Sequence, residues 1–219
     1  MSLERLTFSD RDSWLAGRGS GIGGSDAAAV VGLSPWQTPI GLWKQKTGTE
    51  VAKDISENVA VQQGVRMESA IRGFFQSSHP EFTIEYHQFD ILYQSERPWI
   101  RATLDGEIIT ESGQRGILEI KTSTPSGKMG WSKWADGHIP PNYLTQLVHQ
   151  LLATGYDFAF LFAALYCANG DVILREYQID RSDISDDLIW LRDKEDEFWR
   201  CVQERTVPPM TLTMSITPA

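Results

Sequence analysis

The chain has 219 residues and a formal net charge of −9, and 41% of its residues are hydrophobic. This composition suits a globular domain with a sizeable core and excludes a disordered chain, and no apolar run approaches the roughly 18 residues of a membrane span. The negative charge argues against a nucleic-acid binder that relies on overall positive charge.

The N-terminal sequence predicts a compartment, and the two cysteines predict no special chemistry. Met-Ser-Leu-Glu-Arg contains no apolar signal region, so we expect a cytoplasmic location. Cys167 and Cys201 make neither a disulfide framework nor a zinc site, and both are expected to be buried thiols.

The first predicted elements are two short helices joined by a glycine-rich loop. Residues 8–17 form the first helix, capped by Ser9, and Ser25 caps a second helix that ends at Gly32. The loop between them enters a helix N-terminus, where free N–H groups and the helix dipole favour anions. The alternative is a flexible turn before an ordinary capped helix.

Two further helices follow. Thr38 is expected to cap a helix that starts at Pro39 and ends at Gly48. The longest early helix is predicted to run from Ser56 to about Ser77, with one broad apolar face. That face comprises Val59, Ala60, Gln63, Met67, Ala70, Ile71, Phe74 and Phe75.

A β-hairpin is the central prediction. Residues 81–94 read as a strand interrupted near His87, and two β-patterned segments then flank a turn at 111–116. In the second of these, Glu119 and Lys121 are two apart and share a face of the strand. Asp105 opens the first, so two carboxylates and an ammonium meet in a small space.

The charges of this hairpin allow two interpretations. Two adjacent carboxylates repel each other, and a hard divalent cation such as Mg²⁺ or Mn²⁺ neutralises such a pair. The other interpretation is a cross-strand ion pair on a solvated sheet face, with Asp105 as a turn residue. Charge alone favours the second.

The remaining elements complete an α/β (α+β) fold. Residues 125–134 are irregular or a short helix, and residues 143–154 form a helix that carries Gln146, His149 and Gln150 on one face. Residues 157–167 read as a buried central strand, which a turn at 169–170 joins to a more exposed strand. The last predicted helix spans residues 182–204. Its outer face is acidic: Asp183, Asp186, Asp187, Asp193, Glu195, Asp196 and Glu197.

We therefore predict one domain over residues 1–207, with a central mixed β-sheet flanked by helices, and an extended tail over residues 208–219. No internal repeat or low-complexity linker divides the chain.

Four segments resemble a known family. The sequence from Asp105-Gly to Leu-Glu119-Ile-Lys121-Thr resembles the Asp…Glu-X-Lys core of the PD-(D/E)XK nuclease superfamily. Three others resemble one branch, the lambda-exonuclease and YqaJ-type viral recombinases, in the family's order over about residues 12–165. They are Trp14 to Arg18 running into Gly21 to Asp26, then Gly64 to Glu68, then Tyr143 to Gln150.

This resemblance implies a restriction-endonuclease-like core and a Mg²⁺-dependent 5′-to-3′ exonuclease that acts on duplex DNA ends. One or two Mg²⁺ ions, with Mn²⁺ as a substitute, would bind Asp105, Glu119 and the carbonyl of Ile120. The remaining roles by resemblance are as follows: Lys121 positions or deprotonates the attacking water, Gln146 orients it, Glu68 contacts the metal site, and Arg18 and Ser25 hold the 5′ phosphate.

The resemblance also implies partners. Relatives assemble as ring-shaped homotrimers around the duplex and work with a single-strand annealing protein in phage or prophage recombination, in the bacterial cytoplasm. An acidic enzyme can still hold DNA if its basic groups line one groove. The candidate groups are Arg11, Arg18, Lys44, Lys46, Arg66, Arg72, Lys128 and Lys133.

Two alternatives stay open. A metal-dependent endonuclease of the restriction or repair type could use the same core, but it has no need of a 5′-phosphate pocket. A non-catalytic DNA-binding protein could keep the fold, but it has no need of two repelling carboxylates side by side.

Overall fold

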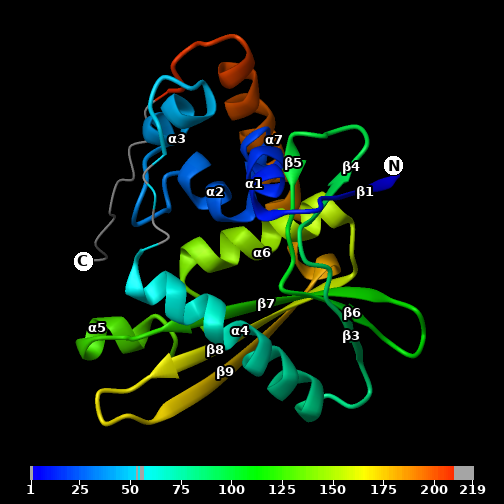
Figure 1. Ribbon diagram of the computed structural model, residues 1–219, viewed down its shortest axis with the longest axis vertical. Coiled ribbons are helices and arrows are strands. Elements are labelled where there is room, and N and C mark those ends of the chain that lie inside the picture. Colours follow the sequence, from blue (N-terminus) through cyan, green and yellow to red (C-terminus); the bar gives the residue numbers. More distant parts are fainter. Residues whose placement is uncertain (1, 53, 55–56, 210–219) are drawn as a thin grey trace.

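A five-stranded mixed β-sheet lies between two layers of helices in the computed structural model, which describes residues 2–52, 54 and 57–209 (Figure 1). The strand order is β3-β6-β7-β8-β9; β7 and β8 are parallel, and the other neighbours are antiparallel. The strands are β3 (Thr83–Glu85), β6 (Gly106–Ile109), β7 (Arg115–Ser123), β8 (Phe158–Tyr166) and β9 (Val172–Asp180).

Two short strand pairs accompany this sheet. One is antiparallel, between β1 (Leu3–Thr7) and β4 (Asp90–Gln94), and the other is parallel, between β2 (Ile22–Gly23) and β5 (Ile100–Arg101). The helices are α1 (Arg11–Gly19), α2 (Gly24–Val30), α3 (Pro39–Lys46), α4 (Val59–Ser78), α5 (Gly127–Ser132), α6 (Pro141–Thr154) and α7 (Ser185–Gln203), with a 3₁₀ turn at Arg181–Ile184.

Helices cover both faces of the sheet. Phe75 of α4 packs on one face against Phe160 and Phe162 of β8. Leu151 of α6 and Leu191 of α7 belong to the core on the other face. Because β8 is buried on both sides, its sequence is almost continuously apolar, as a central strand requires. The structure thus confirms a mixed α/β fold with a central sheet flanked by helices.

The N-caps of the first two helices differ from the prediction. Asp10 caps α1 in place of Ser9, because its carboxylate accepts a hydrogen bond from the Ser13 N–H at 2.9 Å. Gly23 stands at the N-cap of α2, and Ser25 lies inside the first turn. The Asp26 carboxylate accepts from the Gly23 N–H at 3.0 Å, so the capping group comes from within the helix.

The predicted apolar face of α4 is largely wrong. Only its Ile71 and Phe75 are buried, whereas Val59 is 78% and Phe74 55% exposed, because only Ile71 and Phe75 of this helix join the apolar cluster on the sheet. Asn58 caps this helix, and the predicted start at Ser56 lies outside the described residues.

Two burial predictions also fail, and two predictions stay open. Cys167 and Cys201 are free but only partly buried. Glu195, expected on an acidic surface, is fully buried. The domain boundary at residue 207 stays a prediction, and so does the tail, of which residues 210–219 lie outside the described part. Within the ranges that the structure describes, no helix has the length and apolar character of a membrane span.

Candidate active site

The β6–β7 hairpin brings the two predicted carboxylates together. Gly106 pairs with Leu118 in the antiparallel register, so Asp105, one residue before β6, lies opposite Glu119. The backbone N–H of Ile120 donates a hydrogen bond to Oδ2 of Asp105 at 2.8 Å. The acidic pair therefore lies where β6 begins.

Glu119 is held in one orientation. It is 3% exposed, and its carboxylate accepts hydrogen bonds from three side chains. Lys121, on the same face of β7 as predicted, donates from Nζ to Oε1 at 2.5 Å. Two glutamines of α6 complete the set: Gln146 donates to Oε1 and Gln150 to Oε2, each at 2.6 Å.

Burial and charge together set the protonation of this cluster. Burial, followed by the charge of Glu119, raises the pKa of Asp105 well above its ordinary value. Burial would lower the pKa of Lys121, but the carboxylates of Glu119 and Asp105 outweigh it and raise that pKa. One ammonium beside two carboxylates leaves the site short of positive charge, which a divalent cation would supply.

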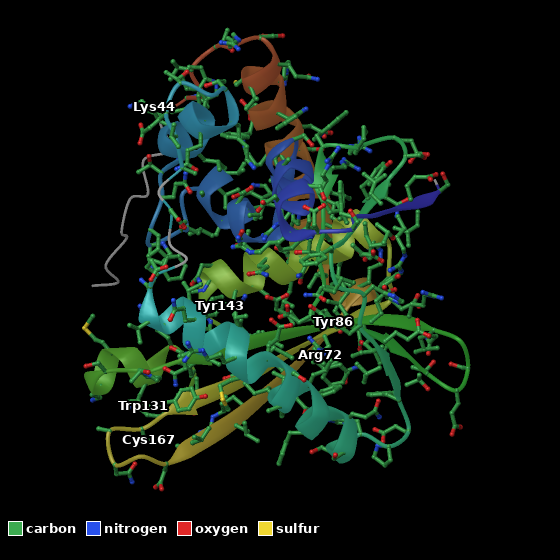
Figure 2. The ribbon with its side chains drawn as sticks, viewed as in Figure 1. Lys44, Arg72, Tyr86, Trp131, Tyr143 and Cys167 are labelled. Atoms are coloured by element: carbon green, nitrogen blue, oxygen red, sulfur yellow. The ribbon has the colours of Figure 1, made fainter. Side chains whose placement is uncertain are left out.

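Arg72 anchors Glu68 to the same site from α4. It donates from Nη2 to the Glu68 carboxylate at 2.6 Å and from Nε to the carbonyl oxygen of Asp105 at 2.5 Å. Its guanidinium lies 3.7 Å from the ring centre of Tyr86, and Figure 2 shows these two side chains next to each other. Burial raises the pKa of Glu68, and the Arg72 charge opposes that rise. The Arg72 side chain is thus occupied by hydrogen bonds within the protein and is not free to contact DNA.

One pocket of about 490 Å³ collects the predicted site residues. Arg18 reaches it from α1, with its guanidinium 4.7 Å from the ring centre of Trp14, and the exposed Ser25 reaches it from α2. The predicted residues that line it are Arg18, Ser25, Glu68, Asp105, Glu119, Ile120, Lys121 and Gln146. A wider groove of about 1250 Å³ around Arg97 and Arg181 contains none of them, so volume alone does not identify the site.

Two further basic side chains expected along a DNA groove form ion pairs within the protein. Lys46 pairs with Asp26 at 2.7 Å, and Lys44 pairs with Glu50 at 3.5 Å. Lys44 lies on α3, well apart from Arg72 and Tyr143 in Figure 2. Of these three, only Tyr143 lines the pocket. Among the lysines and arginines of the described chain, Arg18 and Lys121 line the pocket.

Residues 13–157 match the sequence model of the family described as the YqaJ-like viral recombinase domain. The chain belongs to this family. The YqaJ protein of Bacillus subtilis (strain 168) is 32% identical over 197 residues, which make up 90% of this chain and 58% of the relative. The YqaJ-like chain therefore spans 58% of the length of that curated relative.

Solved structures support the fold of this YqaJ-like domain. An alkaline exonuclease from Laribacter hongkongensis, LHK-Exo, superposes with a TM-score of 0.64 at 17% identity, over 89% of this chain and 94% of that one. A phage-related exonuclease from Haemophilus somnus 129PT gives a TM-score of 0.50 at 12% identity, over 85% and 96% of the two chains. At such identities the similarity establishes the shared fold.

Sequence reasoning missed two polar residues of the YqaJ-like site. Arg72 was placed among the DNA contacts, whereas it ties Glu68 to the backbone of Asp105. Gln150 was placed on the correct face of its helix but given no role, although it binds Glu119. Its spacing of four residues from Gln146 was the available signal, since residues i and i+4 of a helix meet the same neighbour.

The donor set fits a hard cation. In the described part of the chain, no three His, Cys, Asp or Glu side chains lie close enough to hold a metal ion. Mg²⁺ commonly binds proteins through one or two carboxylates and keeps several waters. Asp105, Glu119 and the Ile120 carbonyl therefore suit Mg²⁺ or Mn²⁺ better than zinc, which takes N and S ligands.

Proposed function

We propose that this YqaJ-like domain is a Mg²⁺-dependent exonuclease that degrades one strand of duplex DNA from its 5′ end. The observation that carries the proposal is the pocket itself, which joins the Asp105, Glu119 and Lys121 cluster to Arg18 and Ser25. Membership of a viral recombinase family supports it. So do two structures of similar fold that are described as exonucleases, of which LHK-Exo was also determined in complex with dAMP.

The reaction is hydrolysis of a phosphodiester by in-line attack of water. One or two Mg²⁺ ions, with Mn²⁺ as a substitute, held by Asp105, Glu119 and the Ile120 carbonyl, would supply positive charge where the phosphate gains negative charge. Lys121, an ammonium that donates to Glu119, positions the attacking water. Gln146, bonded to the same carboxylate oxygen as Lys121, orients it. Glu68, fixed by Arg72, closes the α4 side of the site.

The end specificity belongs to a different part of the pocket. Arg18 brings a guanidinium and Ser25 a hydroxyl, and together they suit a terminal phosphate. Trp14 lies against the Arg18 guanidinium and restrains it. An endonuclease would gain nothing from this arrangement, because its substrate presents no free end.

The family relationship extends the proposal to an oligomeric assembly and a recombination pathway. A ring-shaped homotrimer around the duplex would retain DNA despite the net charge of −9. The strand exposed by digestion would pass to a single-strand annealing protein during phage or prophage recombination. The proposed compartment is the bacterial cytoplasm, where phage or prophage DNA would be the substrate.

The first test compares three DNA substrates. Linear duplexes with 5′-phosphate or 5′-hydroxyl ends and a closed circle are incubated with wild type or Lys121→Ala, in Mg²⁺ or EDTA. We expect loss of the 5′-phosphorylated strand in Mg²⁺ only, and a rate about 10²–10³-fold lower in the variant, because it loses a preorganised positive donor beside the reacting phosphate.

The outcomes separate the alternatives. Cutting of the closed circle would identify an endonuclease. DNA binding without any cleavage would identify a non-catalytic binding protein. Equal digestion of 5′-hydroxyl and 5′-phosphate ends would remove the role of Arg18 and Ser25 and leave the nuclease in place.

A further inference from the structure

Gln150 lies directly behind Glu119 and is fully buried on α6. Its Nε2 atom donates to Oε2 of Glu119 at 2.6 Å and to the carbonyl oxygen of Thr103 at 3.3 Å. A carboxylate and a carbonyl can only accept hydrogen bonds, so the amide nitrogen must face them. Both hydrogens of that nitrogen are thereby used.

The oxygen of the same amide is buried without a hydrogen bond from the described residues, which is energetically unfavourable. Oε1 of Gln150 is buried and has no hydrogen-bond partner in the described part of the chain. Leaving a buried polar atom unpaired destabilises a fold, and an apolar side chain of similar length would avoid it. Packing of α6 therefore does not account for a glutamine here, whereas the contact with Glu119 does.

Gln150 differs from its neighbour on the helix. Gln146 is partly exposed and lines the pocket, where it can meet a substrate or water. Gln150 is absent from the pocket lining, and its contact with the catalytic cluster is the hydrogen bond to Glu119. Its second bond joins the backbone two residues before Asp105. One side chain thus fixes the plane of the Glu119 carboxylate relative to the segment that carries Asp105.

We propose that Gln150 is a positioning residue, which holds Glu119 at the spacing from Asp105 that a divalent cation requires. The proposal deepens the proposed function and rests on it. Residues that orient metal ligands by hydrogen bonds change metal affinity or activity by about 10–100-fold when they are replaced. Gln150 acts in this way without touching substrate.

Gln150→Met tests the proposal, because methionine keeps the length and apolar stem but cannot donate. Mg²⁺ is titrated calorimetrically into the full chain without DNA. We expect about 10–100-fold weaker Mg²⁺ binding in the variant and an equal shift in the Mg²⁺ concentration for half-maximal cleavage. The KM for 5′-phosphorylated ends should stay at the wild-type value. Gln150→Leu is the second variant if methionine prevents folding.

Gln76→Met is the matched control. Gln76 is a partly buried glutamine of α4 that bonds three backbone groups, the carbonyls of His79 and Phe82 and the N–H of Ile84, and none of these bonds involves Glu119. Its replacement should lower the melting temperature and leave the Mg²⁺ affinity unchanged. A merely structural Gln150 would behave in the same way.

The results distinguish the positioning role of Gln150 from the proposed nuclease function. Wild-type Mg²⁺ affinity in both Gln150 variants would overturn the positioning role and leave the nuclease intact. Mg²⁺ binding that weakens in the variants, in a chain that cuts no DNA, would support the positioning role and overturn the proposed function. A wild-type chain that binds no Mg²⁺ would overturn both.

Discussion

His149 and Glu195 form a buried pair that demands one extra proton. His149 Nδ1 lies 2.7 Å from Oε1 of Glu195, its Nε2 lies 2.8 Å from the carbonyl oxygen of Arg101, and both side chains are fully buried. Since both neighbours are acceptors, either both ring nitrogens carry hydrogens or the carboxyl holds a proton. Burial would lower the pKa of His149, but the attraction of Glu195 outweighs it and raises that pKa.

This pair should make stability depend on pH. The pKa of His149 is higher in the folded chain than its unfolded value near 6.5, so the pair stabilises fully below about pH 6.5. The stabilisation is lost as pH rises through the folded pKa. We expect Glu195→Gln to flatten this loss, because the amide can donate to Nδ1 while Nε2–H donates to Arg101, with no extra proton.

Urea unfolding of wild type and Glu195→Gln from pH 6 to pH 9 checks this prediction. Above the pKa of His149 in the unfolded chain, the free energy of unfolding should fall more steeply with pH in wild type than in Glu195→Gln. The difference in slope should be at most about 1.4 kcal/mol per pH unit. His79, whose pKa is also raised, titrates equally in both chains and cancels in the comparison. Parallel curves would contradict the assignment of the proton to this pair.

The sequence did indicate that Glu195 is buried, but its negative charge suggested an exposed position. Leu188, Leu191, Phe198 and Val202 form the buried stripe of α7, and position 195 falls on that stripe at helical spacing. Reading the residue by its charge placed it on the acidic surface. A carboxylate on an apolar stripe predicts a buried partner, but only the fold could name His149, which is 46 residues away.

Among the elements, α2 and α6 join the two halves of the candidate site. A Cβ atom on Gly24 would lie 3.1 Å from Cγ of Gln146 and 3.5 Å from Cγ of Gln150. Gly24 precedes Ser25, and both glutamines hold Glu119. The close approach of these helices therefore places the end-binding side chains and the acidic pair in one pocket.

Gly24→Ala should disturb catalysis more than DNA-end binding. The added methyl group pushes on Gln146, and through it on Glu119, and we expect kcat to fall about tenfold, as small misplacements of reacting groups do. Single-turnover cleavage and end binding in EDTA measure the two effects. Gly73→Ala in α4 is the matched control, because its Cβ meets nothing within 4 Å. It should stabilise the chain by about 0.5–1 kcal/mol at unchanged kcat.

Local sequence correctly predicted those elements whose hydrophobic pattern agrees with the side of the element that is buried. The hairpin, α6 and the β8–β9 pair all followed from periodicity and turn residues. The caps at Ser9 and Ser25 failed because Asp10 and Asp26 offer competing carboxylates one position away. The predicted apolar face of α4 was wrong because only Ile71 and Phe75 of this helix join the apolar cluster on the sheet, and no local pattern shows where such neighbours lie.

Across the whole molecule, the exposed aspartates of the last helical segment lie outside the candidate site. The net charge is −9, yet Asp183, Asp187 and Asp193 are exposed on the last helical segment and do not line the 490 Å³ pocket. That pocket gathers residues from α1, α2, α4, the hairpin and α6. Its assembly depends on long-range packing, which explains why family resemblance predicted it and local pattern did not.

Neutralising these exposed acids should therefore change DNA binding through long-range repulsion alone. In the triple variant Asp183→Asn, Asp187→Asn, Asp193→Asn, we expect affinity for a 5′-phosphorylated duplex to rise about two- to threefold at low salt. The gain should vanish near 0.5 M salt, where the Debye length falls to about 4 Å, and kcat should stay constant. Anisotropy titrations across a salt series, beside Arg18→Gln, measure this. Arg18→Gln should instead lose the preference for 5′-phosphate over 5′-hydroxyl ends at every salt concentration. A gain in the triple variant that survives high salt would mean that these aspartates contact DNA directly, although they do not line the pocket.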